Sequence, residues 1–174
     1  MNAPPAPQSG KLGIAAAIAA AVAIAAPLAM KWEGYAPKQY LDPAKIPTWC
    51  YGETEKRLSE DPAYIYSKAE CATLLRARME RDYAPRLAKC LPEIVGNKYV
   101  FGALIDASYN AGWAAVCNSR MARHIKAGDL YSGCVSLDGW YVTARNRKTG
   151  ERIKLRGLVS RRLDEKRVCL QGLV

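Results

Sequence analysis

The hydrophobic pattern separates an unbroken apolar stretch near the start of the chain from a longer region with helical spacing. The stretch from Leu12 to Met30 holds 19 residues without a charge, and ten of them are alanine. As a helix it would be about 28 Å long, close to the ~30 Å hydrocarbon core of a bilayer. Because alanine favours helices but adds little transfer free energy, we expect this segment to enter a membrane only weakly.

Three interpretations of the apolar stretch are open. Ala23-Ile24-Ala25 is similar to a signal-peptidase site, so a cleaved signal peptide is the first. A permanent anchor is disfavoured by the alanine content, and a weak anchor that later leaves the bilayer fits the composition best. The polar, proline-rich residues 1–11 predict a disordered tail. We therefore expect a tail and an apolar segment over residues 1–30, and one folded domain over residues 31–174.

The residues after the apolar stretch predict a small lobe with a sheet. Trp32–Tyr40 has the spacing of a short amphipathic helix whose end is disturbed by Pro37. Residues 40–58 are rich in Pro, Gly, Thr and aromatic side chains, which is typical of short antiparallel strands joined by turns. This part of the chain is therefore expected to begin with a helix and to continue as a small antiparallel sheet.

Helical spacing dominates from residue 67 onward. Ser67 and Glu70 form a capping-box motif, which predicts a helix that runs to about Tyr83 and is broken by Pro85. Further helices are expected over residues 99–112, from 117 or 118 to 127, over 129–137 and over 158–170, with a hairpin around Lys148-Thr149-Gly150. The fold class is therefore α+β, with a sheet-bearing lobe followed by a mainly helical lobe.

Charge and cysteine content narrow the possible partners. The net charge of +10 favours a polyanionic partner, such as an anionic cell wall or acidic lipids. Nucleic acid is disfavoured because the chain has no binding motif and no alternation of basic and aromatic residues. Zinc is disfavoured because the chain has one histidine and no C-x-x-C pair. With an export signal, the six cysteines favour disulfides, although residue spacing alone leaves the pairing open.

Candidate chemistry is concentrated directly after the apolar stretch. Glu33, Asp42 and Thr48 have the spacing E-x8-D-x5-T and are followed by Gly52. Glycoside hydrolysis uses two carboxyl groups, one as a protonated acid and one ionised. Taken singly, each residue has an ordinary explanation: an exposed helix-end glutamate, an aspartate in an Asp-Pro turn and a β-forming threonine. Their joint spacing is what favours a glycosidase site.

This run resembles the phage lysozymes of glycoside hydrolase family 24, and the resemblance continues downstream. Ser108-Tyr109-Asn110-Ala111-Gly112 is similar to the core-helix motif of that family, and Asn118-Ser119 to its next helix start. Gly157-Leu158, Arg161-Arg162 and Glu165 are similar to its carboxy-terminal G-L-x-x-R-R-x-x-E helix. The similarity covers about residues 31–170 in the expected order, and it implies a lysozyme-like fold.

The resemblance also implies a reaction and a set of roles. The substrate would be peptidoglycan, cut between N-acetylmuramic acid and N-acetylglucosamine without a cofactor or metal. Glu33 would protonate the glycosidic oxygen, while Asp42 and Thr48 would position the attacking water on the opposite face of the sugar. Either Arg161 or Arg162 would support Glu33 electrostatically. The saccharide cleft is expected to be lined by Tyr109, Asn110 and Ser119, although roles in the core and as a helix cap are equally consistent.

The front end resembles a subgroup of this family, the secreted endolysins with a signal-anchor-release segment. Such a segment exports the enzyme, tethers it to the inner membrane in the host periplasm and later leaves the bilayer, after which the enzyme acts as a monomer. Only Lys31 and Trp32 separate Met30 from Glu33, so a membrane-bound segment would pin the catalytic residue. Caging by a cysteine before the sheet is not available, because the first cysteine is Cys50.

Two further expectations accompany the resemblance. Many members have a histidine after the glycine that matches Gly52, whereas this chain has Glu53, so local packing around the sheet lobe is expected to differ. The expected disulfides are Cys50–Cys71, Cys90–Cys117 and Cys134–Cys169. The first would join the sheet lobe to the following helix, and the last would join the two final helical segments.

Two other functions compete with a hydrolase. A non-catalytic wall-binding protein on the same scaffold would be expected to have lost Glu33 or Asp42, and the chain keeps both. A lytic transglycosylase can work with one glutamate alone, so the combination of Asp42 with Thr48 argues against it. The end of the product, reducing or anhydro, distinguishes the two enzymes.

Overall fold

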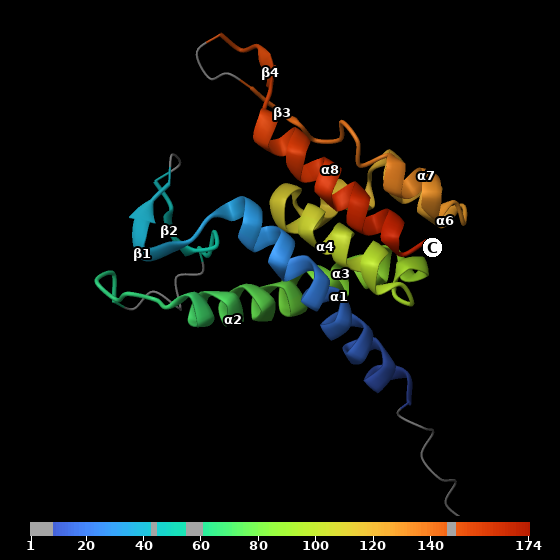
Figure 1. Cartoon of the computed structure of the whole chain (residues 1–174), viewed down its shortest axis with the longest axis horizontal. Coiled ribbons are helices and arrows are strands. Elements are labelled where there is room, and N and C mark those ends of the chain that lie inside the picture. Colours follow the sequence, from blue (N-terminus) through green and yellow to red (C-terminus); the bar gives the residue numbers. More distant parts are fainter. Residues whose placement is uncertain (1–8, 43–44, 55–60, 146–148) are drawn as a thin grey trace, which may run out of the picture.

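The structure is a computed structural model that describes residues 9–42, 45–54, 61–145 and 149–174. Helices make up most of it, and α4 lies at its centre, packed against both α1 and α8 (Figure 1). In chain order the elements are α1 (Ser9–Glu33), β1 (Ala36–Leu41), β2 (Pro47–Cys50), α2 (Lys68–Arg78), a π-helical turn η2 (Met79–Tyr83), α3 (Ala84–Cys90), a 3-10 turn η3 (Pro92–Ile94), α4 (Lys98–Ala111), α5 (Trp113–Cys117), α6 (Arg120–Lys126), α7 (Leu130–Val135), β3 (Thr143–Arg145), β4 (Arg152–Lys154) and α8 (Arg156–Gln171). The α+β class with a small antiparallel sheet is confirmed.

The apolar stretch and the residues up to Glu33 form one continuous helix, α1. The helix ends because Gly34 adopts a positive φ of 73°, a conformation that only glycine takes without strain. The chain then turns directly into β1, so the separate helix expected over Trp32–Tyr40 is wrong. Pro37 lies inside this strand, and its carbonyl accepts a hydrogen bond from the Tyr66 amide at 2.9 Å.

The second half of α1 is part of the hydrophobic core. Ala21, Ala25 and Ala29 recur every four residues and are fully buried. Small side chains on this face let α1 lie very close to α4, where a Cβ added to Gly102 would be 2.8 Å from the Ala21 carbonyl oxygen. The described residues before Ala21 are mostly exposed, and that end of α1 extends beyond the other helices (Figure 1). The expected domain boundary after residue 30 therefore falls within a helix whose second half belongs to the folded core.

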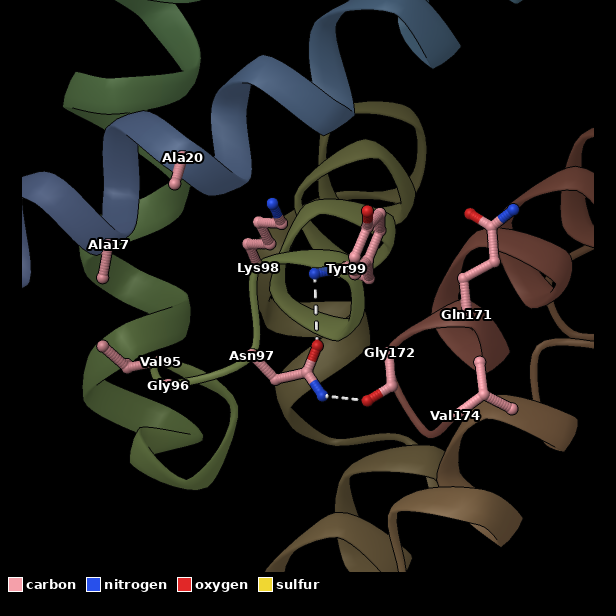
Figure 2. Close-up of a pocket in the computed structure, with 10 residues that line it drawn as sticks. All are labelled: Ala17, Ala20, Val95, Gly96, Asn97, Lys98, Tyr99, Gln171, Gly172 and Val174. Atoms are coloured by element: carbon pink, nitrogen blue, oxygen red, sulfur yellow. Dashed lines mark hydrogen bonds between the residues drawn. The ribbon is translucent and has the colours of Figure 1, made fainter.

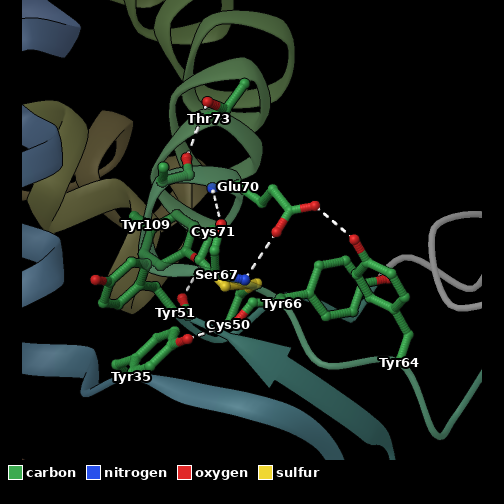
Figure 3. Close-up of a disulfide and its surroundings, with 11 residues drawn as sticks. Tyr35, Cys50, Tyr51, Tyr64, Tyr66, Ser67, Glu70, Cys71, Thr73 and Tyr109 are labelled. Atoms are coloured by element: carbon green, nitrogen blue, oxygen red, sulfur yellow. Dashed lines mark hydrogen bonds between the residues drawn. A yellow bond between two sulfur atoms is a disulfide. The ribbon is translucent and has the colours of Figure 1, made fainter.

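The first sheet is a two-stranded antiparallel hairpin. Its register pairs Tyr40 with Thr48 and Leu41 with Pro47. The end of β2 is joined to α2 by the disulfide Cys50–Cys71, with tyrosine side chains around it (Figure 3). The hairpin therefore has a covalent connection to the helices as well as its packed contacts. Residues 43–44 and 55–60, which belong to the predicted sheet region, lie outside the described residues.

Helix α2 begins with the predicted capping box. The Ser67 hydroxyl accepts from the Glu70 amide, and the Glu70 carboxylate accepts from the Ser67 amide. The predicted break at Pro85 is wrong, because the chain stays helical through η2 into α3. Pro85 lies just after the π-helical turn η2, a local change of helix geometry inside the continuous helix.

The remaining helices follow the predicted order, with two differences. The short helix α5 was not predicted, and α8 begins at Arg156 rather than at residue 158. The side chains of Ser119 and Asp129 cap α6 and α7. The expected pairing of the six cysteines is confirmed, with Cys90–Cys117 and Cys134–Cys169 joining helices in the larger lobe.

The start of α4 and the end of α8 are connected by a hydrogen bond. The side chain of Asn97 caps α4 and also donates to the carbonyl of Gly172 at 2.7 Å (Figure 2).

Between α7 and α8, β3 and β4 pair as an antiparallel hairpin with Thr143 opposite Lys154, which confirms the hairpin in this region. Of its expected turn residues, Lys148 lies outside the described part of the chain.

Candidate active site

Glu33 is held at the end of α1 by Arg161 from the middle of α8. Arg161 Nη1 donates to Glu33 Oε1 at 2.5 Å, and the same guanidinium reaches both oxygens of Asp106 at 2.7 and 3.1 Å. Asp106 is fully buried, whereas the Glu33 side chain keeps 25% of its exposure. The sequence predicted that either Arg161 or Arg162 contacts Glu33, and in the structure this residue is Arg161.

The electrostatics of this arginine follow from its neighbours. Burial alone would lower the pKa of Arg161, but the carboxylates of Asp106 and Glu33 outweigh it and raise that pKa. The guanidinium is therefore permanently charged. A planar donor with a fixed fork orients the carboxylates that it contacts, so Arg161 fixes the direction of the Glu33 side chain.

Arg162 faces a different set of partners. Its Nη2 donates to Asn110 Oδ1 at 2.6 Å, and its Nη1 lies 3.0 Å from Glu165 Oε2. Burial, together with the neighbouring Asp106, raises the pKa of Glu165 well above its usual range. Glu165 is thus a buried acid that tends to keep its proton, one helical turn from Arg161, the residue that contacts Glu33.

Gly52 brings the sheet lobe against Glu33. A Cβ at Gly52 would lie 3.7 Å from Glu33 Oε2 and 3.5 Å from the Tyr109 hydroxyl. Tyr109 comes from α4 and donates to the Tyr51 carbonyl at 2.5 Å. Burial raises the pKa of Tyr109, so the phenol stays protonated and keeps this hydrogen bond. The turn after β2 is therefore fastened to α4 beside the candidate acid.

Asp42 and Thr48 lie on the β1–β2 hairpin. Asp42 Oδ1 accepts from the Ile46 amide at 2.8 Å, and the backbones of the same two residues are also hydrogen-bonded at 3.0 Å. Thr48 is buried, and its hydroxyl donates to the Ile46 carbonyl at 3.0 Å. Ile46 therefore connects the two candidates, which lie on the lobe that approaches Glu33 through Gly52.

Glu53, the residue at which the sequence departs from its resemblance, forms a buried ion pair. Its Oε1 lies 2.5 Å from Arg78 Nη1 on α2, and its side chain is 4% exposed. Together with the disulfide at Cys50 and the hydrogen bond to Tyr51, this pair fixes the residues around Gly52 from three directions. The expected difference in local packing therefore takes the form of a charged contact between the lobes.

A pocket of about 480 Å³ opens beside Glu33. Its lining combines the ends of α1 and α4 with the start of α8: Trp32, Glu33, Asn110, Leu155, Arg156, Gly157, Leu158 and Arg161. Glu33 and Asn110 thus line the same cavity. Besides these two, its wall carries the guanidinium groups of Arg156 and Arg161, so polar groups converge in it.

The other two predicted cleft residues, Tyr109 and Ser119, use their hydroxyl groups in hydrogen bonds within the chain. Ser119 is buried, donates to the Val116 carbonyl at 2.7 Å and accepts from the Ala122 amide, as a helix cap does.

Asp106, which contacts Arg161, is not among the site residues predicted from the sequence. A single carboxylate inside the apolar run of α4 was the available signal, because a buried charge needs a partner.

Comparisons with known proteins agree with this architecture. A family model described as phage lysozyme matches residues 30–165. The SAR-endolysin of bacteriophage PS119 is 33% identical over 143 residues, covering 80% of this chain and 77% of the relative. The SAR-endolysin of enterobacteria phage P21 is 32% identical over the same length, with 80% and 78% covered.

Solved structures share the fold at lower identity. The active form of the P1 phage endolysin Lyz superposes with a TM-score of 0.69 and 21% identity, covering 85% of this chain and 83% of that one. The endolysin of Escherichia coli O157:H7 phage FAHEc1 gives 0.65 and 21%, with 84% and 90% covered. The match to the family model spans most of the chain, and the chain belongs to the phage lysozyme family, whose endolysins are peptidoglycan-degrading hydrolases.

Proposed function

We propose that this chain is an exported endolysin that hydrolyses the β-1,4 bond between N-acetylmuramic acid and N-acetylglucosamine to lyse the host cell. The observation that carries the proposal is the contact between Arg161 and Glu33 at the wall of a pocket. A carboxyl group fixed in direction and partly shielded from water is suited to protonate a leaving-group oxygen.

The other half of the reaction is assigned to the sheet lobe. Asp42 keeps one carboxylate oxygen engaged by the Ile46 amide, and Thr48 anchors its hydroxyl on the Ile46 carbonyl. In the proposed mechanism these residues hold the attacking water on the sugar face opposite Glu33, which gives inversion at the anomeric carbon. Tyr109 and Asn110 support the cleft through the turn after β2 and through Arg162.

End-group analysis of the products tests this proposal. Purified peptidoglycan is digested with the full chain, and the fragments are analysed by mass spectrometry and by proton NMR of the new anomeric centre. We expect reducing N-acetylmuramic acid ends that appear first as the α anomer. Anhydro-muramic ends would identify a lytic transglycosylase instead, and release of peptides without new sugar ends would refute glycosidase activity.

The proposal extends to localisation. The helix Gly13–Glu33 is long and apolar enough to cross a membrane, yet its second half is core in the folded enzyme. Ala21, Ala25 and Ala29 cannot pack against α4 while they lie in a bilayer. We infer that residues 1–30 act as tail and anchor in a tethered, inactive form in the periplasm. The active form is a monomer in which the anchor has joined the domain of residues 31–174.

An uncoupler experiment tests this part separately. Spheroplasts that express the chain are kept energised, and lysozyme activity is measured at the outer face of the inner membrane before and after depolarisation. We expect activity, and release of the chain from the membrane fraction, only after the uncoupler is added. Full activity in energised spheroplasts, with the segment still in the membrane fraction, would contradict the tethered inactive form.

A further inference from the structure

The β3–β4 hairpin carries a group of basic side chains at the start of α8. It projects from the helical lobe at one end of the molecule (Figure 1). Arg152 and Lys154 lie on β4 two residues apart, so their side chains share one face of the strand, and Arg156 follows at the first position of α8. All three are exposed. We call Arg152, Lys154 and Arg156 the basic arm.

The basic arm lacks acidic partners of its own. Within the described residues, none of its three side chains forms an ion pair or a hydrogen bond. Lys154 contributes to the electrostatic field at Asp138, but the ion pair of Asp138 is with Lys166 at 2.7 Å. Three adjacent cations without an acid repel one another, and a bound anion would relieve that repulsion.

A second pocket places the basic arm beside the candidate active site. It has a volume of about 480 Å³ and is lined by Lys154, Arg156, Val159 and Ser160. Arg156 also lines the pocket that contains Glu33 and Arg161. The two cavities therefore meet at Arg156, and a polymer bound at Glu33 would have its neighbouring groups next to the basic arm.

We propose that the basic arm binds the carboxylates of the peptides that substitute the muramic acid residues of the glycan strand. This inference rests on the proposed function, which supplies the substrate class. Muramic acid carries its peptide on a lactyl ether, so the acidic groups lie to the side of the sugar chain. A guanidinium at the junction of the two pockets can pair with such a carboxylate in a bidentate manner, and the ammonium of Lys154 adds a second contact.

The position of the basic arm favours the peptide over an anionic membrane. A lipid surface requires exposed cations that face outward together, and it makes no use of a pocket that adjoins the acid. Arg156, in contrast, contacts both cavities. The carboxylates of the peptides lie at a fixed place relative to the bond that is cut, so binding them at the basic arm would also set the register of the glycan strand in the cleft.

Binding to two forms of the wall tests the inference without relying on cleavage. The full chain with Glu33→Gln is tested for binding to glycan strands that carry their peptides and to strands from which an amidase has removed them, both coupled to beads, at low and at physiological salt. The test variant adds Lys154→Ala and Arg156→Ala. The matched control adds Arg123→Ala and Lys126→Ala, which removes two exposed charges from α6.

We expect the Glu33→Gln chain to bind peptide-bearing strands more tightly than peptide-free ones, and the test variant to lose about 5-fold or more of that preference. The control should keep it. An equal loss in the control, or an equal loss on both forms of the strands, would overturn the inference. A loss confined to vesicles containing phosphatidylglycerol would assign the basic arm to lipid instead. If the Glu33→Gln chain shows the preference but the wild-type chain releases no new sugar ends from peptidoglycan, the hydrolase is refuted and the binding inference stands.

Discussion

Arg161 is the residue on which the geometry of the candidate acid depends. It contacts Glu33 and Asp106 directly, and its Nε lies 3.4 Å from Glu165 Oε1. Breaking a buried ion pair by removing one partner is far more harmful than losing a surface pair, because the other charge is left without compensation. Arg161 therefore joins the stability of the helical lobe to the direction of the Glu33 side chain.

Replacement of Arg161 tests this role. Arg161→Lys should lower kcat by about 10²-fold in protein that still melts cooperatively, because an ammonium cannot hold Glu33 and Asp106 in one plane. Arg167→Lys is the matched control, since Arg167 is 72% exposed and pairs only at the surface. The measurement is the initial rate of reducing-end release. A folded Arg161→Lys protein with the kcat of the control would show that Glu33 does not need this support.

Glu165 predicts a pH dependence of stability. Its folded-state pKa is raised from an ordinary value of 4.5, so the folded chain holds a proton that the unfolded chain releases as the pH rises. The free energy of unfolding should therefore fall as the pH rises above about 4.5 towards the raised pKa. In Glu165→Gln this contribution is absent, so its stability relative to the wild type should improve with increasing pH.

Urea unfolding at a series of pH values measures this difference. Glu93→Gln is the control, because Glu93 is exposed on η3. Its profile should run parallel to that of the wild type. Parallel profiles for Glu165→Gln as well would mean that the pKa of Glu165 is the same in the folded and the unfolded chain.

At the scale of elements, the contact between α1 and α4 decides whether Glu33, the proposed acid, is in place. Glu33 is the last residue of α1, so the packing of Ala21, Ala25 and Ala29 on α4 sets its position. At Gly102 the two helices leave no space for a Cβ, which would lie 2.8 Å from both the Ala21 oxygen and the Ile24 Cβ. The alanine-rich composition thus serves close helix packing as well as weak membrane insertion.

Gly102→Ala should therefore destabilise the protein although alanine is the better helix former. Overpacking costs about 1–3 kcal/mol and the gain in helix propensity is about 1 kcal/mol, so we expect a net loss of about 1 kcal/mol. For a chain of this size, that lowers Tm by about 2–4 °C. Gly13→Ala is the control, because nothing lies within 4 Å of a Cβ there. Equal melting temperatures for the two variants would contradict the close contact.

Local signals predicted the elements that depend on local chemistry. The capping box at Ser67 and Glu70 and the helix-capping Asp129 appear as predicted, because a side chain that satisfies a free amide acts over three residues. The break at Pro85 was wrong because the helix continues past this residue by way of the π-helical turn η2, which the sequence pattern did not indicate. The helix expected over Trp32–Tyr40 failed because Gly34 ends α1 with a positive φ, which no periodicity records.

The candidate site, too, could be predicted from the sequence only in part. The spacing of Glu33, Asp42 and Thr48 could be read from the chain, and their roles remain predictions. The choice of Arg161 over Arg162 could not, since adjacent helical residues point about 100° apart and only the packing of α8 decides which one faces Glu33. Asp106 and Arg78 belong to the surroundings of the site because they contact Arg161 and Glu53, residues of distant elements. A single sequence does not specify such contacts.

For the whole molecule, the use of the N-terminal helix as core in the folded chain is incompatible with its proposed use as a membrane anchor. In the folded enzyme Ala21–Ala29 contribute buried side chains to the core, and residues 13–16 are exposed. Deletion of residues 2–16 should leave a cooperative melt and most of the activity. Deletion of residues 2–30 should abolish both, because it removes one side of the contact with α4. Circular dichroism melts and rates of peptidoglycan clearing measure the two outcomes.

An active and cooperatively melting chain without residues 2–30 would contradict this account of the core. It would mean that α1 is only an anchor and that the remaining helices form the domain alone. The deletion of residues 2–16 is the control for this result, since it removes part of the apolar segment while keeping Ala21, Ala25 and Ala29. Loss of activity in that variant with an unchanged melt would place a functional role in residues 2–16.

The central claim is that Glu33 is the acid that protonates the glycosidic oxygen. The most direct measurement is the rate of reducing-end release from purified peptidoglycan by the wild type, by Glu33→Gln and by the control Glu80→Gln, which alters an exposed glutamate. We predict a loss of about 10²–10⁴-fold in Glu33→Gln, with an unchanged melting curve and an unaffected control. A folded Glu33→Gln protein that releases reducing ends at the wild-type rate would contradict the assignment.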